Sequence, residues 1–333
     1  MCIKCYAAMK NGAALEEFSY ELKPLGAKDI KIEITHCGVC HSDVHLIDND
    51  WGFSEFPLVP GHEIVGTVAE VGAEVEALKV GQRVGVGGQA RSCHECEYCT
   101  QGQDIFCPTP VYTAVHEYGG FATAIQVDSR FAFPIPESIS SEVAAPLLCA
   151  GITTFVPLAR GVSSTSKVGV IGVGGLGHVA LQYAKAFGCE VTAFSTSPDK
   201  EEYAKGLGAH HFVNSKDPAQ MEATAGKLDF ILSTVCADLP WGDYLNALKP
   251  NGTICVVGIG ETIEIPTLPL IFGQKTITSS LIGNPSDFTK MLEFSALHNV
   301  APQVKVMPMS QAAEAIETVR TSYLGHRIVL TNK

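Results

Sequence analysis

The second half of the chain constrains the fold most strongly, because apolar strand patterns alternate there with helical patterns. The alternation begins at Lys167. Parallel strands joined through helices require right-handed crossovers, and both faces of their sheet are covered. The pattern therefore predicts a doubly wound α/β domain. The expected strands cover residues 168–171, 191–194, 211–213, 229–235, 253–257 and 277–282, and the first expected helices cover 176–187 and 198–207.

A glycine-rich turn separates the first of these strands from the first helix. It reads Gly172-Val173-Gly174-Gly175-Leu176-Gly177. Glycines permit a tight turn and a close approach of the backbone to a pyrophosphate, and free N–H groups at the helix start face the anion. A lone motif of this kind is weak evidence, but its place between a strand and a helix predicts a dinucleotide site. An ordinary strand-to-helix turn is the alternative.

The end of the second strand bears on the choice between NAD and NADP. An NAD site usually has an acidic residue there, which binds the ribose 2′-hydroxyl. This chain has Ser195, Thr196, Ser197 and Lys200, whose hydroxyl and ammonium groups can donate hydrogen bonds to a 2′-phosphate. We therefore predict NADP(H). The hydroxyls could instead cap the following helix, and Asp199 keeps NAD as an alternative.

The first part of the chain has a different character. Short apolar runs at residues 30–34, 64–71 and 83–86 are separated by glycine turns, which is typical of a β-rich domain. A length of 333 residues also favours two domains. The tail adds helical patterns at 286–299 and 312–320 and a short strand at 327–330.

Composition excludes several classes of partner and location. A net charge of −12 without a basic stripe argues against nucleic acid. The first residues lack a continuous apolar segment, so secretion is not indicated. The most apolar stretch, 168–184, is interrupted by glycines and a histidine, which argues against a membrane span. We expect a reducing, cytoplasmic location, where the 12 cysteines are metal ligands and small core residues.

Four of these cysteines have the spacing of a structural zinc site. Cys93, Cys96, Cys99 and Cys107 follow the pattern C-x2-C-x2-C-x7-C, which lets four thiolates converge on one tetrahedral ion. Reduced surface thiols or two disulfides are the alternatives.

A second metal site is suggested by residues that lie far apart in the sequence. Cys40, His62 and Cys149 would provide two thiolates and one imidazole, leaving a fourth zinc position open for water or substrate. Each of the three has an ordinary alternative as a spare thiol, a loop histidine or a small buried side chain. Spacing alone does not decide between these interpretations.

The chain resembles the zinc-dependent medium-chain alcohol dehydrogenases, in particular the cinnamyl-alcohol-dehydrogenase-like subgroup. Five motifs occur in family order over essentially the whole chain: residues 38–43, 61–63, 93–107, 147–154 and 172–178. The resemblance implies a catalytic GroES-like domain, a partly open β-barrel, from residues 1–150 and 285–333. It also implies a Rossmann NADP(H)-binding domain from residues 151–284.

The resemblance further implies roles for individual residues. Cys40, His62 and Cys149 match catalytic zinc ligands, and Glu63 matches a glutamate able to approach that metal. The four cysteines from Cys93 to Cys107 match the structural zinc, which makes two zinc ions per subunit. The other matched positions are Asp43, which orients a ligand histidine; Ser42 and His45, a proton relay; and His41 and Thr153, which contact the cofactor.

These positions together imply an enzyme that transfers hydride between NADP(H) and a primary alcohol or aldehyde, mainly as a reductase of aromatic or unsaturated aldehydes. An NAD-linked alcohol or polyol dehydrogenase is one alternative, and a non-catalytic zinc- and nucleotide-binding protein is another. By family analogy the strand at 277–282 pairs with its copy in a homodimer, possibly within a homotetramer. Trp51 is either a substrate-pocket wall or a packing residue. We expect no catalytic role for the remaining histidines, which are His36, His94, His116, His178, His210, His211, His298 and His326, and expect most to be solvated or satisfied in loops.

Overall fold

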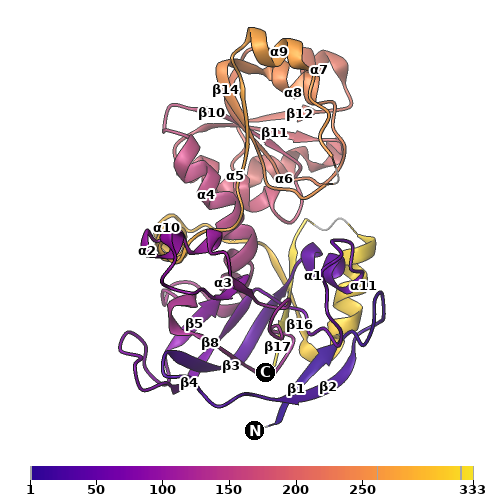
Figure 1. Ribbon diagram of the computed structural model, residues 1–333. Helices are drawn as coiled ribbons and strands as arrows, with labels where there is room; N and C mark the ends of the chain where they lie inside the picture. Colours follow the sequence, from indigo (N-terminus) through magenta and orange to yellow (C-terminus); the bar gives the residue numbers. More distant parts are fainter. Residues whose placement is uncertain (1, 261, 323–324, 333) are drawn as a thin grey trace. The chain divides into compact units, whose positions relative to one another are not determined.

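The computed structural model describes residues 2–260, 262–322 and 325–332, which form two compact units (Figure 1). The first unit comprises the residues up to Ile152, then Ile282–Leu297 and those from Pro302 onward. The second unit comprises Thr153–Leu281 and His298–Ala301. The chain therefore leaves the first unit after Ile152 and returns to it at Ile282.

The second unit is built on a six-stranded parallel sheet, which confirms the predicted doubly wound class. Its strand order is β12-β11-β10-β13-β14-β15, and every neighbouring pair is parallel. The strands are β10 (Lys167–Ile171), β11 (Glu190–Ser195), β12 (His211–Asn214), β13 (Leu228–Ser233), β14 (Leu248–Val256) and β15 (Thr276–Ser279). The helical segments are α4 (Ile152–Gly161), α5 (Gly177–Ala186), η4 (Pro198–Lys200), α6 (Glu201–Gly206), α7 (Pro218–Glu222), α8 (Trp241–Ala247) and α9 (Thr267–Phe272).

The central strands are buried on both faces, as crossover helices on each side of a parallel sheet require. Val168, Val170, Ile231 and Leu232 have no more than traces of exposed surface. The prediction for the last strand is wrong at its C-terminal end, because β15 stops at Ser279. Beyond it the chain leaves the sheet on its way back to the first unit.

The first unit contains a seven-stranded, mainly antiparallel sheet. Its order is β16-β17-β3-β4-β5-β9, and β8 also pairs with β3. The strands are β3 (Asp29–Val39), β4 (Ile64–Val71), β5 (Arg83–Val86), β8 (Ala124–Asp128), β9 (Ala132–Pro134), β16 (Val304–Pro308) and β17 (Arg327–Thr331). Two small antiparallel sheets pair β1 (Cys2–Ala7) with β2 (Glu16–Glu21), and β6 (Gln89–Arg91) with β7 (Val111–Tyr112).

Short helices join these strands and carry several predicted site residues. The tail belongs to this unit because β17 pairs antiparallel with β3, with Ile328 opposite Val39. The helical segments are α1 (His41–Ile47), α2 (Glu97–Thr100), η1 (Asp104–Phe106), η2 (Ser129–Phe131), α3 (Ser141–Pro146), η3 (Leu147–Gly151), α10 (Pro285–His298), η5 (Met309–Gln311) and α11 (Ala312–Thr321).

One helical run in the described part of the chain, Ser141–Gly161, has the length and apolar composition that crossing a membrane would require. Of its most apolar 18-residue stretch, 78% is buried inside the protein, as in the core helix of a globular protein. The run contains a π-helical turn, η3, at Leu147–Gly151. Such turns are rare and frequently mark functional sites.

Candidate metal centres and dinucleotide loop

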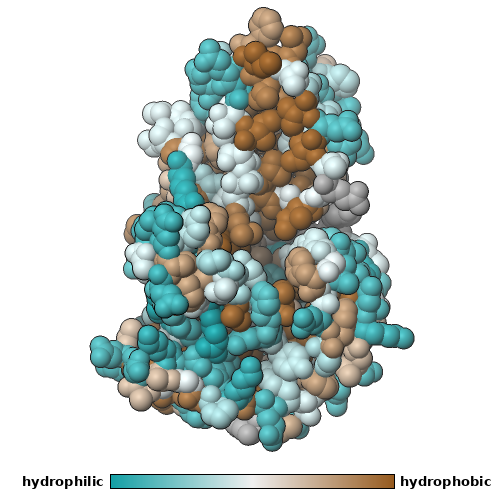
Figure 2. Space-filling view, viewed as in Figure 1, coloured by the Kyte–Doolittle hydropathy of each residue, from teal (hydrophilic) through white to brown (hydrophobic). Residues whose placement is uncertain are grey.

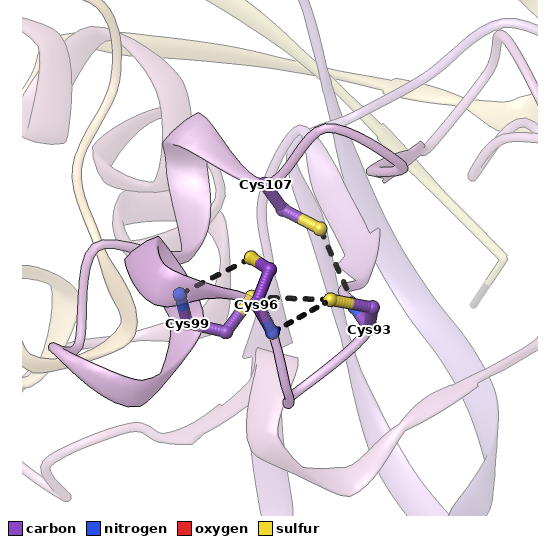
Figure 3. Close-up of side chains that lie close together, drawn as sticks. All are labelled: Cys93, Cys96, Cys99 and Cys107. Atoms are coloured by element: carbon purple, nitrogen blue, oxygen red, sulfur yellow. Dashed lines mark hydrogen bonds between the residues drawn. The ribbon is translucent and has the colours of Figure 1, made fainter.

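The four cysteines of the predicted structural site converge in one loop (Figure 3). Their sulfur atoms all lie within 4.8 Å of one another, and the Sγ atoms of Cys93 and Cys99 are 3.9 Å apart. Two sulfurs that each lie about 2.3 Å from a tetrahedral zinc are separated by about 3.8 Å. The separation is far longer than the roughly 2.05 Å of a disulfide. The donor set therefore fits zinc.

Backbone amides support these sulfurs as thiolates. The N–H groups of Cys96 and Cys93 donate to the Sγ atoms of Cys93 and Cys107 at 3.3 and 3.4 Å. Cys96 is the N-cap residue of α2, and its Sγ accepts from the amide of Cys99 at 3.5 Å. Backbone hydrogen bonds from Glu95 and Cys96 lower the pKa of Cys93 to about 6, whereas burial raises the pKa of Cys99 to about 12. A cation is needed to hold all four as thiolates.

The second cluster combines Cys40, His62, Glu63 and Cys149, which come from three distant parts of the chain. One ligand atom from each lies within 4.8 Å of the others. The Sγ atoms of Cys40 and Cys149 are 3.8 Å apart, again the spacing of two sulfurs on one tetrahedral zinc. Cys40 follows β3, His62 and Glu63 precede β4, and Cys149 lies in the π-helical turn. The fold therefore brings together all four predicted residues.

Asp43 is fully buried beside this cluster and contacts two of its ligand residues, Cys40 and His62. One carboxylate oxygen accepts from the amide of Cys40 at 2.9 Å. The other accepts from the amide of Gly61 at 2.9 Å and lies 3.1 Å from Nδ1 of His62. A carboxylate accepts hydrogen bonds, so Nδ1 carries the proton and Nε2 keeps the lone pair that a metal requires.

The hydrogen bond between the two thiols of the cluster favours the thiolate form of Cys40 and the protonated form of Cys149. The hydrogen bond with Cys149 lowers the pKa of Cys40 well below its ordinary value and raises that of Cys149 well above it. Burial alone would lower the pKa of His62, but Asp43 and Cys40 raise it well above its usual range. Without a cation the site therefore retains protons, and binding of a metal would release them.

Glu63 forms a buried ion pair with Arg327 of β17. The side chains are 0% and 6% exposed. Burial raises the pKa of Glu63 to about 8, although the charge of Arg327 opposes that rise. Oε2 of Glu63 has no hydrogen-bond partner within the described residues, so a buried acceptor lies beside the sulfurs. A side chain at Gly38 would lie 1.9 Å from this oxygen, which is why glycine occupies that position.

Arg327 is a site residue that sequence reasoning missed. It comes at the start of a short apolar strand in the tail, and nothing local connects it with a residue 264 positions earlier. Only the pairing of β17 with β3 places the two side by side. The only sequence feature that could have suggested a role for Arg327 is its charge at the start of a largely apolar strand.

The predicted relay residues lie on α1, directly after Cys40. The hydroxyl of Ser42 is 3.6 Å from Sγ of Cys40. Nδ1 of His45 lies 2.7 Å from a carboxylate oxygen of Asp50, a second residue that sequence reasoning missed. The His45 ring also lies 5.2 Å from that of Trp51. Because Trp51 packs against the hydrophobic core as well, the packing interpretation of this residue is supported.

Two other predicted cofactor residues lie at the ends of helices. His41 opens α1, and its ring is 4.9 Å from that of His45. Burial, followed by the charge of His45, lowers the pKa of His41. Thr153 lies in the first turn of α4 and is 9% exposed.

The glycine-rich turn connects β10 to α5, as predicted. Gly172 has φ of 90°, and a side chain there would lie 2.4 Å from Val235. A side chain at Gly177 would lie 1.8 Å from the carbonyl oxygen of Gly172, so this glycine allows the helix to pack closely. Gly174 faces open space instead, because a Cβ atom there would meet no atom within 4 Å. Gly175 and Leu176 are half-buried.

The end of β11 and the residues after it carry the predicted donor groups, and one of them contacts the glycine-rich turn. Nζ of Lys200 donates to the carbonyl of Val173 at 3.1 Å. Ser197 takes the cap position of η4 but makes no side-chain cap bond, whereas the Ser195 hydroxyl accepts from the amide of Ser197 at 3.2 Å. Thr196 and Asp199 lie between these residues in the sequence. The capping alternative therefore does not account for the Ser197 hydroxyl.

Family models match both units. The model described as alcohol dehydrogenase GroES-like domain matches residues 26–137, and that described as zinc-binding dehydrogenase matches residues 175–296. With the parallel sheet and the two metal-ligand clusters, they define a zinc-binding dehydrogenase with a GroES-like unit and a Rossmann-type unit. The predicted fold class is confirmed.

Individual relatives agree over nearly the full length. The chain is 40% identical to the aldehyde reductase AdhA of Synechocystis, covering 99% of each chain. It is 42% identical to 8-hydroxygeraniol dehydrogenase of Catharanthus roseus, covering 98% of this chain and 93% of the relative. The solved structure of a cinnamyl alcohol dehydrogenase from Sorghum bicolor matches with a TM-score of 0.95 at 38% identity, covering 99% and 98% of the two chains.

A cinnamyl alcohol dehydrogenase from Helicobacter pylori, solved with NADP(H), matches with a TM-score of 0.91 at 32% identity, covering 99% and 98%. The chain belongs to the zinc-binding medium-chain alcohol dehydrogenases, in the group of the cinnamyl alcohol dehydrogenases and related reductases. It is a zinc-dependent alcohol dehydrogenase, and the prediction of an enzyme of this family is confirmed.

Proposed function

We propose that this enzyme uses NADP(H) and works mainly as a reductase of aromatic or unsaturated aldehydes. In this proposal the first unit carries both zinc ions and the reaction, and the second unit binds the cofactor. The observation that carries the proposal is the convergence of Cys40, His62 and Cys149 with a sulfur separation of 3.8 Å. These three would hold the catalytic zinc, and Glu63 would be able to approach it. The structural zinc would be held by Cys93, Cys96, Cys99 and Cys107.

When bound, a catalytic zinc polarises a carbonyl or lowers the pKa of an alcohol, and NADPH supplies the hydride. The residues of the chain prepare for this chemistry. Asp43 fixes the ring of His62 and the backbone of Cys40. Because Asp43 is fully buried, its charge stays close to both ligands with little screening by water.

Proton transfer is assigned to Ser42 and His45. They are three residues apart on α1 and therefore share one face of the helix. Ser42 is next to the cluster, while the His45 side chain is 24% exposed and can exchange protons with solvent. The contact with Asp50 fixes Nδ1 of His45 and leaves Nε2 as the nitrogen for exchange.

The preference for NADP(H) is supported by the donors after β11 and by the NADP(H) complex of the Helicobacter pylori relative. Lys200 already donates to Val173, but an ammonium group has three donors and can also serve a 2′-phosphate. The test is steady-state kinetics with both cofactors. A higher kcat/KM with NADPH than with NADH is expected, and the reverse ratio would establish the NAD alternative.

The substrate class is supported by relatives named cinnamyl alcohol dehydrogenase and 8-hydroxygeraniol dehydrogenase. A relative from Fragaria ananassa named probable mannitol dehydrogenase, 41% identical over 98% of this chain, favours the polyol alternative. A panel of cinnamaldehyde, geranial, hexanal and fructose, assayed with NADPH and with NADH, separates the two. Loss of turnover in Cys149→Ala with retained NADPH binding is the control for catalysis at the proposed zinc. No turnover with any substrate would support a non-catalytic protein.

We also propose a homodimer formed through the edge of the second sheet. β15 pairs only with β14, so its other edge has no partner among the described residues. Leu268, Ile271 and Phe272 of the neighbouring α9 are 68%, 68% and 84% exposed, and Figure 2 shows apolar side chains gathered over this unit. An apolar surface beside an unpaired edge fits a second copy. A monomer in analytical ultracentrifugation would refute the dimer.

All twelve cysteines lie in the described part of the chain and none of them forms a disulfide, which also fits the proposed cytoplasmic location. Small alcohols and aldehydes remain the proposed partners at the site.

A further inference from the structure

His178 is among the histidines for which the sequence predicts no catalytic role, yet it is one of the most deeply buried polar residues in the chain. It is the second residue of α5 and is 0% exposed. Its Nδ1 lies 3.0 Å from the carbonyl oxygen of Gly174. A carbonyl oxygen only accepts, so Nδ1 carries the proton and donates it to Gly174. The backbone amide of His178 donates to the same oxygen at 3.1 Å, so two donors of one residue hold it.

The carbonyl of Gly174 is one of three consecutive loop carbonyls that accept hydrogen bonds from side chains. The Thr234 hydroxyl donates to Gly172 at 3.4 Å, besides its shorter bond to Ile171 at 2.8 Å. Lys200 donates to Val173 at 3.1 Å, and His178 completes the set. The three donors come from the segment after β13, from η4 and from α5. The loop is therefore held by side chains from three parts of the unit and not by its own backbone alone.

The glycine content of the loop explains why its carbonyl groups need these hydrogen bonds. Glycine adopts backbone angles on both sides of φ = 0 almost equally well, so peptide planes in a glycine-rich turn rotate easily. A rotation that turned the carbonyl of Gly174 toward a bound anion would replace an attractive N–H group with a repulsive oxygen. A Cβ atom at Gly174 would meet no atom within 4 Å, so side-chain packing does not restrain this residue and the hydrogen bonds to its carbonyl do.

We propose that His178 is a positioning residue for the cofactor pyrophosphate. It keeps the carbonyl of Gly174 directed into the helix, so that the free amides of the turn remain available to phosphate oxygens. It acts through Gly174 and does not itself contact the ligand. The inference rests on the proposed use of a dinucleotide. It predicts that loss of the His178 side chain weakens the binding of the cofactor through its pyrophosphate and not through its adenosine part.

The test compares His178→Leu with His178→Asn in the zinc-loaded enzyme. Leucine has no donor, whereas the amide nitrogen of asparagine is as many bonds from Cβ as Nδ1 and can restore the hydrogen bond. Val179→Ala is the matched control, because Val179 is equally buried on α5 and its side chain has no hydrogen-bonding group. The probes are NADPH and 2′-AMP, which lacks the pyrophosphate, titrated by fluorescence or calorimetry.

We expect His178→Leu to raise the Kd for NADPH about tenfold, equivalent to about 1.4 kcal/mol. The Kd for 2′-AMP should change by less than about twofold, since 2′-AMP makes no contact that depends on the loop carbonyl. His178→Asn should recover most of the NADPH affinity, and Val179→Ala should keep it. In turnover, His178→Leu should raise the KM for NADPH with little change in kcat at saturation.

Three results would overturn the proposal. They are unchanged NADPH affinity in His178→Leu, equal losses for NADPH and 2′-AMP, and failure of His178→Asn to recover where Leu has lost affinity. If the unaltered enzyme prefers NADH, the assignment of NADP(H) fails but the pyrophosphate is the same. The comparison is then made between NADH and adenosine. Binding of neither dinucleotide by the unaltered enzyme would refute both proposals.

Discussion

Removal of Arg327 should leave an uncompensated charge at the centre of the first unit. Glu63 and Arg327 are 0% and 6% exposed, so neither charge is solvated when its partner is lost. Breaking a buried ion pair from one side destabilises a protein by about 3–5 kcal/mol, mainly through the partner left behind. We therefore expect Arg327→Met to lower the free energy of unfolding of this unit by about that amount above about pH 8, where Glu63 of the unaltered enzyme is ionised.

A double-mutant cycle separates the charge effect from lost packing. Glu63→Gln combined with Arg327→Met removes both charges, so the double variant should be more stable than Arg327→Met alone. The chain contains one tryptophan in each unit, Trp51 and Trp241. In a Trp241→Phe background, the fluorescence of Trp51 follows urea unfolding of the first unit alone. Additive losses in the cycle, or a loss below about 1 kcal/mol in Arg327→Met, would refute the reasoning.

The pH dependence of Arg327→Met gives a further check. Burial already raises the pKa of Glu63 to about 8, and loss of Arg327 removes the charge that opposes this rise. An acid whose pKa is raised on folding binds more protons in the folded state, so it favours folding at low pH and this contribution is lost as pH rises. Below about pH 8 Glu63 is protonated in both folded proteins, so the destabilisation relative to the unaltered enzyme should be smaller at about pH 7 than at about pH 9.5. The double variant, which has no titrating group at position 63, should lack this slope.

Three other predictions concern the relay, the acid limit of stability and the structural metal. Asp50→Asn should lower kcat about tenfold, because Asp50 fixes the ring of His45. The free energy of unfolding should not change, because the Asp50 side chain is half exposed. An unchanged kcat would exclude Asp50 from the relay. Burial alone would raise the pKa of Asp29, but hydrogen bonds from Arg91 and Gln126 make the net shift a lowering. The ionised Asp29 therefore stabilises the fold above the ordinary pKa of an aspartate, and this stabilisation disappears as pH falls below about 4. Asp29→Asn should then show a shallower acid-induced loss of stability in thermal melts, and identical slopes would contradict this. Cys99→Ser should reduce bound zinc from two equivalents to one by elemental analysis while the Cys40 cluster keeps its ion, and two retained equivalents would show that Cys99 is no ligand.

The sequence predicted well those elements that depend on interactions between neighbouring residues. Residues 168–171 and the glycine run that follows were placed correctly because a buried strand, a tight turn and a helix start each have a residue signature. The cysteine loop at 93–107 was equally accessible, since its four ligands lie within one short segment. Prediction was poorer at the last strand of the sheet, where the end of pairing depends on the path back to the first unit.

The sequence by itself therefore determined the parallel sheet, the dinucleotide turn and the structural cysteine cluster, because neighbouring residues carry those features. Residue type suggested Cys40, His62 and Cys149 as metal ligands, but spacing could not decide it without the resemblance to a family, and the tertiary structure brings them within reach of one ion. Arg327 meets Glu63 only because β17 pairs with β3, and no local pattern foretells that pairing. His178 lies close to Gly174 in the sequence, but only the fold shows that its ring is buried and directed at the turn. Charges and hydrogen bonds of such groups acquire their energy only when the fold excludes water, so the tertiary structure decides which polar residues matter.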